Sequence, residues 1–165
     1  METLKNLVVV TIAVALVLVL GSLLTQRVSA VNKPILRAFY LTTTQHTGDQ
    51  ASIACAAGFH MASMWEVVDP SNLRYDDSLG FRNPNQDSNG APSGKSGWIA
   101  TGTEPIAAGL PGETNCSSWS SSSGELLGTA ASLELVWNST ATAVSPWHAW
   151  TFTCNTRERV WCMED

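Results

Sequence analysis

Four cysteines constrain this chain more than any other feature of its sequence. The last two, Cys154 and Cys162, are separated by seven residues, and Cys55 and Cys116 lie upstream. No cysteine pair has the close spacing of a zinc knuckle, which disfavours a structural metal site. An even number of cysteines in an exported chain is typical of a disulfide framework, and four cysteines allow three pairings. The residues alone leave those three pairings open.

The N-terminal segment predicts export. Residues 7–24 form an apolar run, and small residues that suit a signal peptidase follow it. Residues 1–30 are therefore predicted to be a signal peptide that is cleaved after Ala30. The run is also long enough to span a bilayer, so a signal anchor at residues 7–24 is the alternative and the only membrane contact expected. In both cases residues 31–165 form one domain that is secreted, periplasmic or at the cell surface.

The balance of charges and aromatic residues limits the classes of partner. The chain has a formal net charge of −5, which disfavours nucleic acids and anionic membrane surfaces because both are held by clusters of Lys and Arg. The chain also contains seven tryptophans. This is dense for one small domain, and some of these rings must form the core.

Two capping-box patterns predict two short helices near the start of the domain. Thr47 and Gln50 have the spacing of an N-cap and its returning partner, and Ser63 and Glu66 repeat it. Gly58 is expected to end the first helix, whose buried face would carry Ala51, Ala54 and Cys55.

Short strands are predicted behind these helices. Aromatic and β-branched runs, or alternating apolar residues, indicate strands at 39–44, 98–100, 133–137, 147–154 and 159–162. The polar stretch at 69–97 is predicted to be a long loop. Helices followed by short strands favour the α+β class.

Several motifs together resemble the C-type lectin-like fold. The spacing from Cys55 through Gly58 to Met61-Ala62-Ser63-Met64 is similar to the first-helix signature of that fold. The core strand of the family resembles Trp98-Ile99-Ala100, and its closing cysteine spacing resembles Cys154-x7-Cys162.

Within that fold the chain is most similar to the endostatin-like branch, which comprises the C-terminal domain of some collagens and its bacterial relatives. The motifs that carry this likeness are Cys116-x2-Trp119, Gly128-x-Ala130-x-Ser132-Leu133 and Cys154-x7-Cys162-Met163-Glu164, and the likeness covers residues 39–165. It implies two short helices packed on twisted antiparallel sheets with long loops. It also implies two nested disulfides, Cys55 with Cys162 and Cys116 with Cys154, and a role in binding rather than catalysis.

The chain departs from the calcium-dependent lectins of that fold. Glu104-Pro105 is followed by Ile106, which cannot ligate a cation, so calcium-dependent sugar binding is not expected. Weak calcium candidates are Asn85, Asp87 and Asn89, which lie in an oxygen-rich run before Gly90. The alternative for this run is a series of Asx turns in a surface loop. No other cofactor is expected.

Two classes of function remain open. In the first, loops 69–97 and 117–146 bind an extracellular protein or glycan, with Trp119, Trp147, His148 and Trp150 as ligand-binding candidates. In the second, the chain is a secreted hydrolase that uses His148 or a carboxylate pair drawn from Glu66, Asp69, Asp76 and Asp77. The carboxylates also suit capping and loop charge, and His60 suits a hydrogen-bonded structural role. The sequence therefore favours a binding domain over an enzyme.

Overall fold

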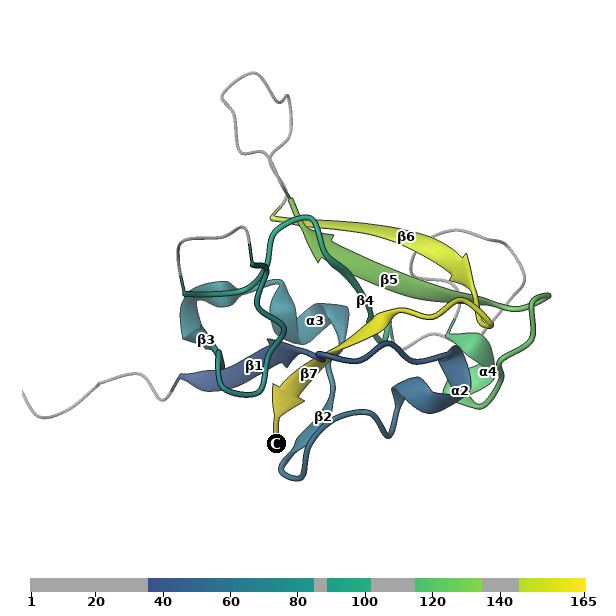
Figure 1. The fold of residues 1–165 in the computed structure, drawn as a ribbon, viewed down its shortest axis with the longest axis horizontal. Coiled ribbons are helices and arrows are strands. Elements are labelled where there is room, and N and C mark those ends of the chain that lie inside the picture. The colour runs from purple at the N-terminus through teal and green to yellow at the C-terminus, as the bar shows by residue number, and fades with distance from the viewer. Residues whose placement is uncertain (1–35, 85–88, 102–114, 135–145) are drawn as a thin grey trace, which may run out of the picture. The chain divides into compact units, whose positions relative to one another are not determined.

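The computed structural model describes residues 36–84, 89–101, 115–134 and 146–165. These residues form a mixed sheet with short helices around it (Figure 1). In chain order the elements are β1 (Arg37–Leu41), α2 (Gly48–Ala51), β2 (Phe59–Met61), α3 (Met64–Val67), the 3₁₀ turn η1 (Pro70–Asn72), β3 (Leu73–Tyr75), β4 (Ser96–Trp98), α4 (Cys116–Trp119), β5 (Leu127–Leu133), β6 (Trp147–Thr153) and β7 (Arg159–Glu164).

The predicted signal peptide at residues 1–30 and the apolar run at 7–24 lie outside the described residues. Among the residues that are described, no helix is long and apolar enough to cross a membrane.

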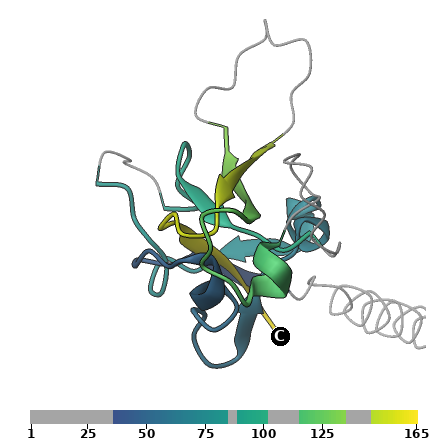
Figure 2. The same ribbon diagram turned by 90° about the vertical axis from the view of Figure 1, so that its right-hand side faces the viewer.

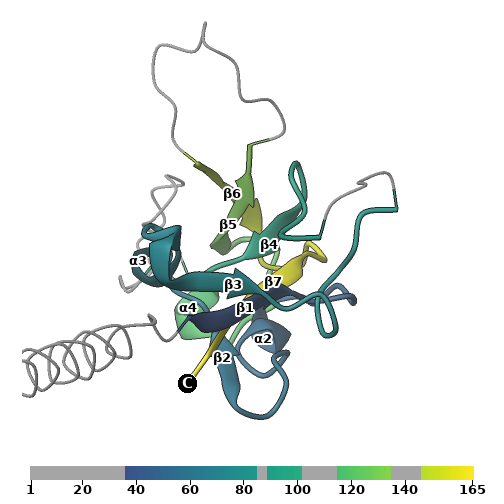
Figure 3. The same cartoon turned by 90° about the vertical axis from the view of Figure 1, so that its left-hand side faces the viewer.

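The sheet is organised around β7. Its strand order is β3-β1-β7-β4-β5-β6, and β2 also pairs with β7. β7 runs antiparallel to β1 and β2 and parallel to β4. Figure 3 shows β3, β1 and β7 next to one another. The prediction of purely antiparallel sheets is therefore wrong, since β1–β3 and β4–β7 are parallel pairs.

Both predicted capping boxes are present. Thr47 and Gln50 begin α2, and Ser63 and Glu66 begin α3. The first helix is shorter than predicted because it ends at Ala51, and the chain then turns through Gly58 at a φ of +82° into β2. Glycine adopts this left-handed conformation without a steric penalty, so Gly58 starts a strand rather than simply ending a helix.

The serine-rich segment contains a helical turn that the sequence did not predict. All four residues of α4 have positive φ values, between 47° and 59°. Such a left-handed run is costly for L-residues. The turn is anchored to the core by the buried side chains of Cys116 and Trp119, whereas Ser117 and Ser118 are exposed. Figure 2 shows α4 beside α2.

The two strands near the C-terminus follow the predicted ranges. β6 covers 147–153 and β7 covers 159–164. The two do not pair with each other, because β6 pairs along its length with β5 and β7 lies between β1 and β4. β5 ends at Leu133, where a strand was predicted to begin, and residues 135–137 of that prediction lie outside the described residues. The small residues of β5, such as Ala130 and Ala131, are fully buried, and their tertiary context outweighs their low intrinsic preference for strands.

Tryptophans form the core on both faces of the sheet. Trp161 is fully buried and meets Trp147 edge-to-face at 5.0 Å between ring centroids. On the opposite face Trp98, also fully buried, meets Trp119 at 5.8 Å. Each of the two central rings has a hydrogen bond for its indole N–H, since Trp161 donates to Ala131 O at 2.8 Å and Trp98 donates to a backbone carbonyl at 2.8 Å. These bonds remove the cost of burying a polar group.

Two disulfides join distant parts of this core. Cys55 is bonded to Cys162 across a sequence separation of 107, and Cys116 is bonded to Cys154 across a separation of 38. This is the nested pairing that the family resemblance implied. The first bond fixes the turn after α2 to β7, and the second fixes α4 to the end of β6.

The two disulfides are predicted to differ in their contributions to stability. In the chain-entropy model a longer closed loop restricts the unfolded chain more. Replacing Cys55 and Cys162 by Ala should lower the free energy of unfolding by about 5 kcal/mol, and replacing Cys116 and Cys154 by about 4 kcal/mol. Urea denaturation of the two double variants and the wild type measures both losses. Free thiols in the wild type, or a bridge between Cys154 and Cys162, would contradict the pairing.

Candidate functional site

The structure does not bring the four aromatic ligand candidates together. Trp119 and Trp147 are only 9% and 8% exposed, and they pack on opposite faces of the sheet. The indole N–H of Trp147 donates to Val67 O at 2.9 Å. Both rings belong to the core, because their area is needed to bury the short strands around them.

His148 and Trp150 are on the outer part of β6. Their ring centroids are 5.0 Å apart, and His148 Nδ1 lies 3.4 Å from Glu134 Oε1. His148 is exposed and Trp150 is partly buried. Period-two alternation along a strand places these two side chains on one face.

The weak calcium candidates are only partly described. Asn85 and Asp87 lie outside the described residues, and Asn89 is exposed. Asp77 Oδ1 accepts a hydrogen bond from Gly90 N at 3.2 Å, which anchors the end of this loop. In the parts of the chain that are described, no three His, Cys, Asp or Glu side chains are grouped in a way that would hold a metal ion.

The acidic hydrolase candidates have local roles. Asp69 accepts from Ser71 N at 3.0 Å, and Asp76 accepts from Ser78 N at 2.9 Å. These hydrogen bonds lower the pKa of both carboxyls. The two side chains therefore stabilise turns, as the capping interpretation predicted.

Glu66 belongs to an ionic cluster with His60. His60 Nδ1 lies 2.7 Å from Asp165 Oδ1, and His60 Nε2 lies 3.0 Å from Glu66 Oε1. Arg37 Nη1 donates to the same Glu66 oxygen at 3.2 Å. Ser63 donates to Glu66 Oε2 through both its backbone N–H and its hydroxyl, at 3.0 and 2.9 Å. The cluster joins β1, β2, α3 and the residue that follows β7, which is a structural role of the kind expected for His60.

The charges of this cluster shift two pKa values in opposite directions. Partial burial acts to lower the pKa of His60, but hydrogen bonds and charge from Asp165 and Glu66 outweigh it and raise the pKa. Burial likewise acts to raise the pKa of Glu66, but the bonds from Ser63 and His60 outweigh it and lower the pKa. Protonated His60 is therefore favoured between two carboxylates.

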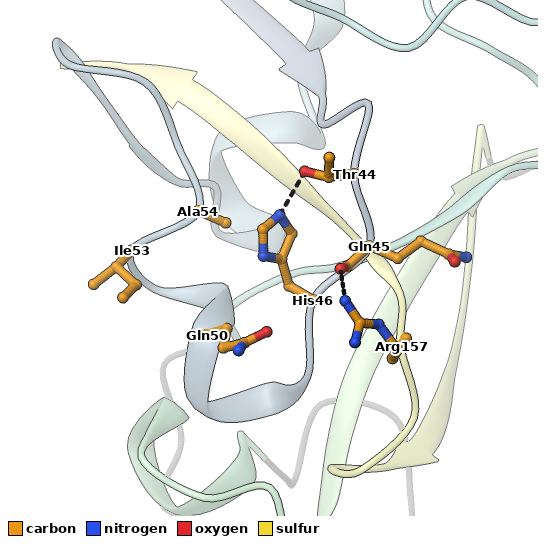
Figure 4. A pocket seen from close by; sticks show the side chains of 7 residues that line it. All are labelled: Thr44, Gln45, His46, Gln50, Ile53, Ala54 and Arg157. Carbon is orange, nitrogen blue, oxygen red and sulfur yellow. Dashed lines mark hydrogen bonds between the residues drawn. The ribbon is translucent and has the colours of Figure 1, made fainter.

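A separate hollow lies among residues that the sequence did not single out as ligand-binding. It is open, has a volume of about 440 Å³, and lies between the loop before α2, the turn after α2 and the turn that joins β6 to β7 (Figure 4). Its lining consists of Thr44, Gln45, His46, Gln50, Ile53, Ala54 and Arg157.

Backbone contacts fix the parts that line this hollow. His46 and Glu158 exchange two backbone hydrogen bonds, at 2.6 and 3.0 Å, so the loop before α2 is joined to the start of β7. Gly48 N donates to Cys154 O at 2.8 Å beside the Cys116–Cys154 disulfide. Cys55, next to the lining residue Ala54, is held by the other disulfide. The hollow is therefore built on anchored segments, which lowers the entropy lost when a ligand binds.

The polar groups of the hollow are neutral except for Arg157. Partial burial, and then the charge of Arg157, lower the pKa of His46, so its imidazole is neutral at pH 7. His46 Nε2 lies 2.8 Å from Thr44 Oγ1. Arg157 Nη2 donates to Gln45 O at 3.1 Å, and in the described parts of the chain no carboxylate lies within ion-pair distance of this guanidinium.

Ile53 gives the hollow an apolar edge. Its aliphatic side chain is 82% exposed. In the sequence Ile53 directly precedes Ala54, which was predicted to lie on the buried face of the first helix. A sequence signal for the hollow did exist here, since an isoleucine off the apolar face of an amphipathic pattern has no core to enter. No local pattern indicated that Arg157 lines the hollow, because only the folded β6–β7 turn places this side chain there.

Comparisons with known proteins give no match to this chain, whether with protein-family models, curated proteins or solved structures. The described residues form a small α+β domain that has a mixed sheet, two disulfides and the hollow beside α2.

The ionic cluster predicts a pH-dependent contribution to stability. Because the folded pKa of His60 is raised, its stabilising effect is complete below the unfolded value of about 6.5 and is lost as the pH rises through the folded value. The variant His60→Gln should therefore have a lower Tm than the wild type at about pH 5.5, and the difference should shrink by about pH 8.5. Glu66, with its lowered pKa, stays ionised throughout this range.

For His46 the predicted effect of pH on stability is the opposite of that for His60. Its folded pKa is lowered, so the wild type should lose stability relative to His46→Gln as the pH falls below about 6.5. Thermal unfolding of both variants across the same buffers tests the two signs together. A His60→Gln deficit that grows with rising pH would contradict the cluster.

Proposed function

We propose that this chain is an exported, disulfide-stabilised binding domain of the C-type lectin-like fold, closest to the endostatin-like branch. It recognises an extracellular protein or glycan without calcium-dependent lectin chemistry. The nested disulfides, the two capped helices after the first strand and the order of the motifs support the proposed kinship. Two disulfides are also compatible with an extracellular location.

The hollow beside α2 is the observation that carries this proposal. Its lining combines neutral donors and acceptors, an exposed aliphatic side chain and one cation on anchored backbone, and such convergent polar groups can fix the orientation of a ligand. Its volume of about 440 Å³ lies within the range of small-ligand sites. The proposed contact surface thus moves from loops 69–97 and 117–146 to residues 44–54 and the β6–β7 turn.

The hydrolase alternative has less support. His148 lies beside one carboxylate, Glu134, but it is exposed on β6 and does not line the hollow. General acid–base work requires a group within hydrogen-bond reach of a bound substrate. A binding role therefore accounts better for the arrangement of these residues.

A matched pair of aliphatic substitutions tests the proposal. The full chain, produced in an exporting host, is applied to an array of glycans and matrix proteins with calcium and with chelator. Ile53→Ser should weaken binding about 10-fold or more, since burying such a side chain contributes about 1.5–3 kcal/mol. Val68→Ser is the control. Val68 directly follows α3, is 56% exposed and does not line the hollow.

The expected pattern is binding that survives chelation and Val68→Ser but not Ile53→Ser. Equal binding by both variants would remove the hollow as the contact surface. Binding that requires calcium would overturn the non-lectin proposal.

A further inference from the structure

Among the described residues that line the hollow, Arg157 alone carries a full charge, on its guanidinium. It is exposed, and its one described hydrogen bond, from Nη2 to Gln45 O, leaves its other N–H groups able to donate. A planar guanidinium binds a carboxylate through two parallel hydrogen bonds, which are stronger than bonds between neutral groups. The hollow is therefore suited to a ligand with one negative charge.

The nearby carboxylates do not neutralise this cation. Asp49 Oδ1 accepts from the Thr47 hydroxyl at 2.6 Å, and Glu158 Oε2 accepts from the Ser96 hydroxyl at 2.7 Å. Both acidic side chains are thus directed to partners other than Arg157. A ligand carboxylate would meet the guanidinium without displacing an internal ion pair.

The rest of the lining fits a ligand with several hydroxyl groups. Thr44 carries a hydroxyl, His46 is neutral with one donor and one acceptor nitrogen, and Gln50 carries an amide (Figure 4). Because Thr44 Oγ1 and His46 Nε2 are bonded to each other at 2.8 Å, the neutral groups left for a ligand are the second ring nitrogen of His46, the remaining capacity of the Thr44 hydroxyl and the amide N–H groups of Gln50. Ile53 adds an aliphatic surface, which suits the C–H face of a sugar ring better than another polar group would.

The low number of cations argues for one charge on the ligand. The whole chain has a net charge of −5, and a polyanion would be repelled by it. A polysulfated chain would need several Lys or Arg side chains along its path, whereas the hollow supplies one. A peptide carboxylate would use Arg157 but would leave the three neutral groups without hydroxyl partners.

We propose that the hollow binds a single carboxylate-bearing sugar at the end of a glycan, with Arg157 on the carboxylate, Thr44, His46 and Gln50 on the hydroxyls and Ile53 against the ring. This inference rests on the proposed binding function and assigns its ligand class.

The experiment compares each acidic sugar with its own methyl ester, in which the carboxylate loses its negative charge and gains one methyl group. The probes are oligosaccharides ending in sialic acid or glucuronic acid, their methyl esters and their neutral counterparts, together with a sulfated oligosaccharide and an acidic peptide. Binding to the full chain is measured by calorimetry for the wild type, Arg157→Gln, Arg157→Lys and Ile53→Ser. Arg74→Gln is the matched control, because Arg74 is an exposed arginine of β3 that does not line the hollow.

At least one acidic probe should bind, and Arg157→Gln should weaken it by about 10- to 100-fold, as expected for a lost charge-assisted hydrogen-bond pair. Esterification should weaken wild-type binding similarly, and Arg157→Gln should have no further effect on the ester. Arg157→Lys should retain part of the affinity, and Arg74→Gln should retain all of it. Thermal unfolding of each variant confirms that the exposed substitutions leave the fold intact.

The outcomes separate this inference from the proposed function. If neutral sugars or esters bind as tightly as the acids, and Ile53→Ser still abolishes binding, the acidic-sugar assignment is wrong while the binding function stands. If binding on the array is insensitive to Ile53→Ser, the proposed function fails first. Tighter binding of sulfated probes, or of an acidic peptide in place of the sugars, would also overturn the assignment.

Discussion

Strand β7 is the element on which the rest of the structure depends. It pairs with β1, β2 and β4, and its residues from Val160 to Met163 are buried. Trp161 fills one face of the sheet, and Cys162 carries the bond to Cys55. A strand held by backbone hydrogen bonds, a large buried ring and a covalent bridge is costly to displace. It therefore serves as the fixed reference for the short elements around it.

That fixed strand explains how so little regular structure can hold the residues of the proposed ligand site in place. The helices next to the hollow and next to the ionic cluster are single turns, which are not stable alone in water. One end of β7 holds the loop of His46 through Glu158, and the other end holds the cluster of His60 and Glu66. The two sites are thus at opposite ends of one strand. The proposed recognition at the hollow and the predicted pH response of the cluster therefore depend on opposite ends of the strand.

Burial decides which aromatic residues are free to bind a ligand. Trp119 and Trp147 are core residues, while the exposed apolar surface at the hollow comes from Ile53. Tryptophan is a common ligand contact, but a small domain needs the area of most of its rings for its own core. The same competition explains Gly128 of β5, where a Cβ atom would collide with Cys116 Sγ and press against the rings of Trp98 and Trp119.

The sequence by itself determined the local features of this protein. The capping boxes at Thr47 and Ser63 and the strands of β6 and β7 follow from the preferences of neighbouring residues. The mixed pairing of the sheet, the burial of the tryptophans and the hollow were decided only by the tertiary structure. Arg157 and Ile53 line the same hollow although they are about a hundred residues apart in the sequence, and their placement depends on the packing of the whole domain rather than on any local pattern.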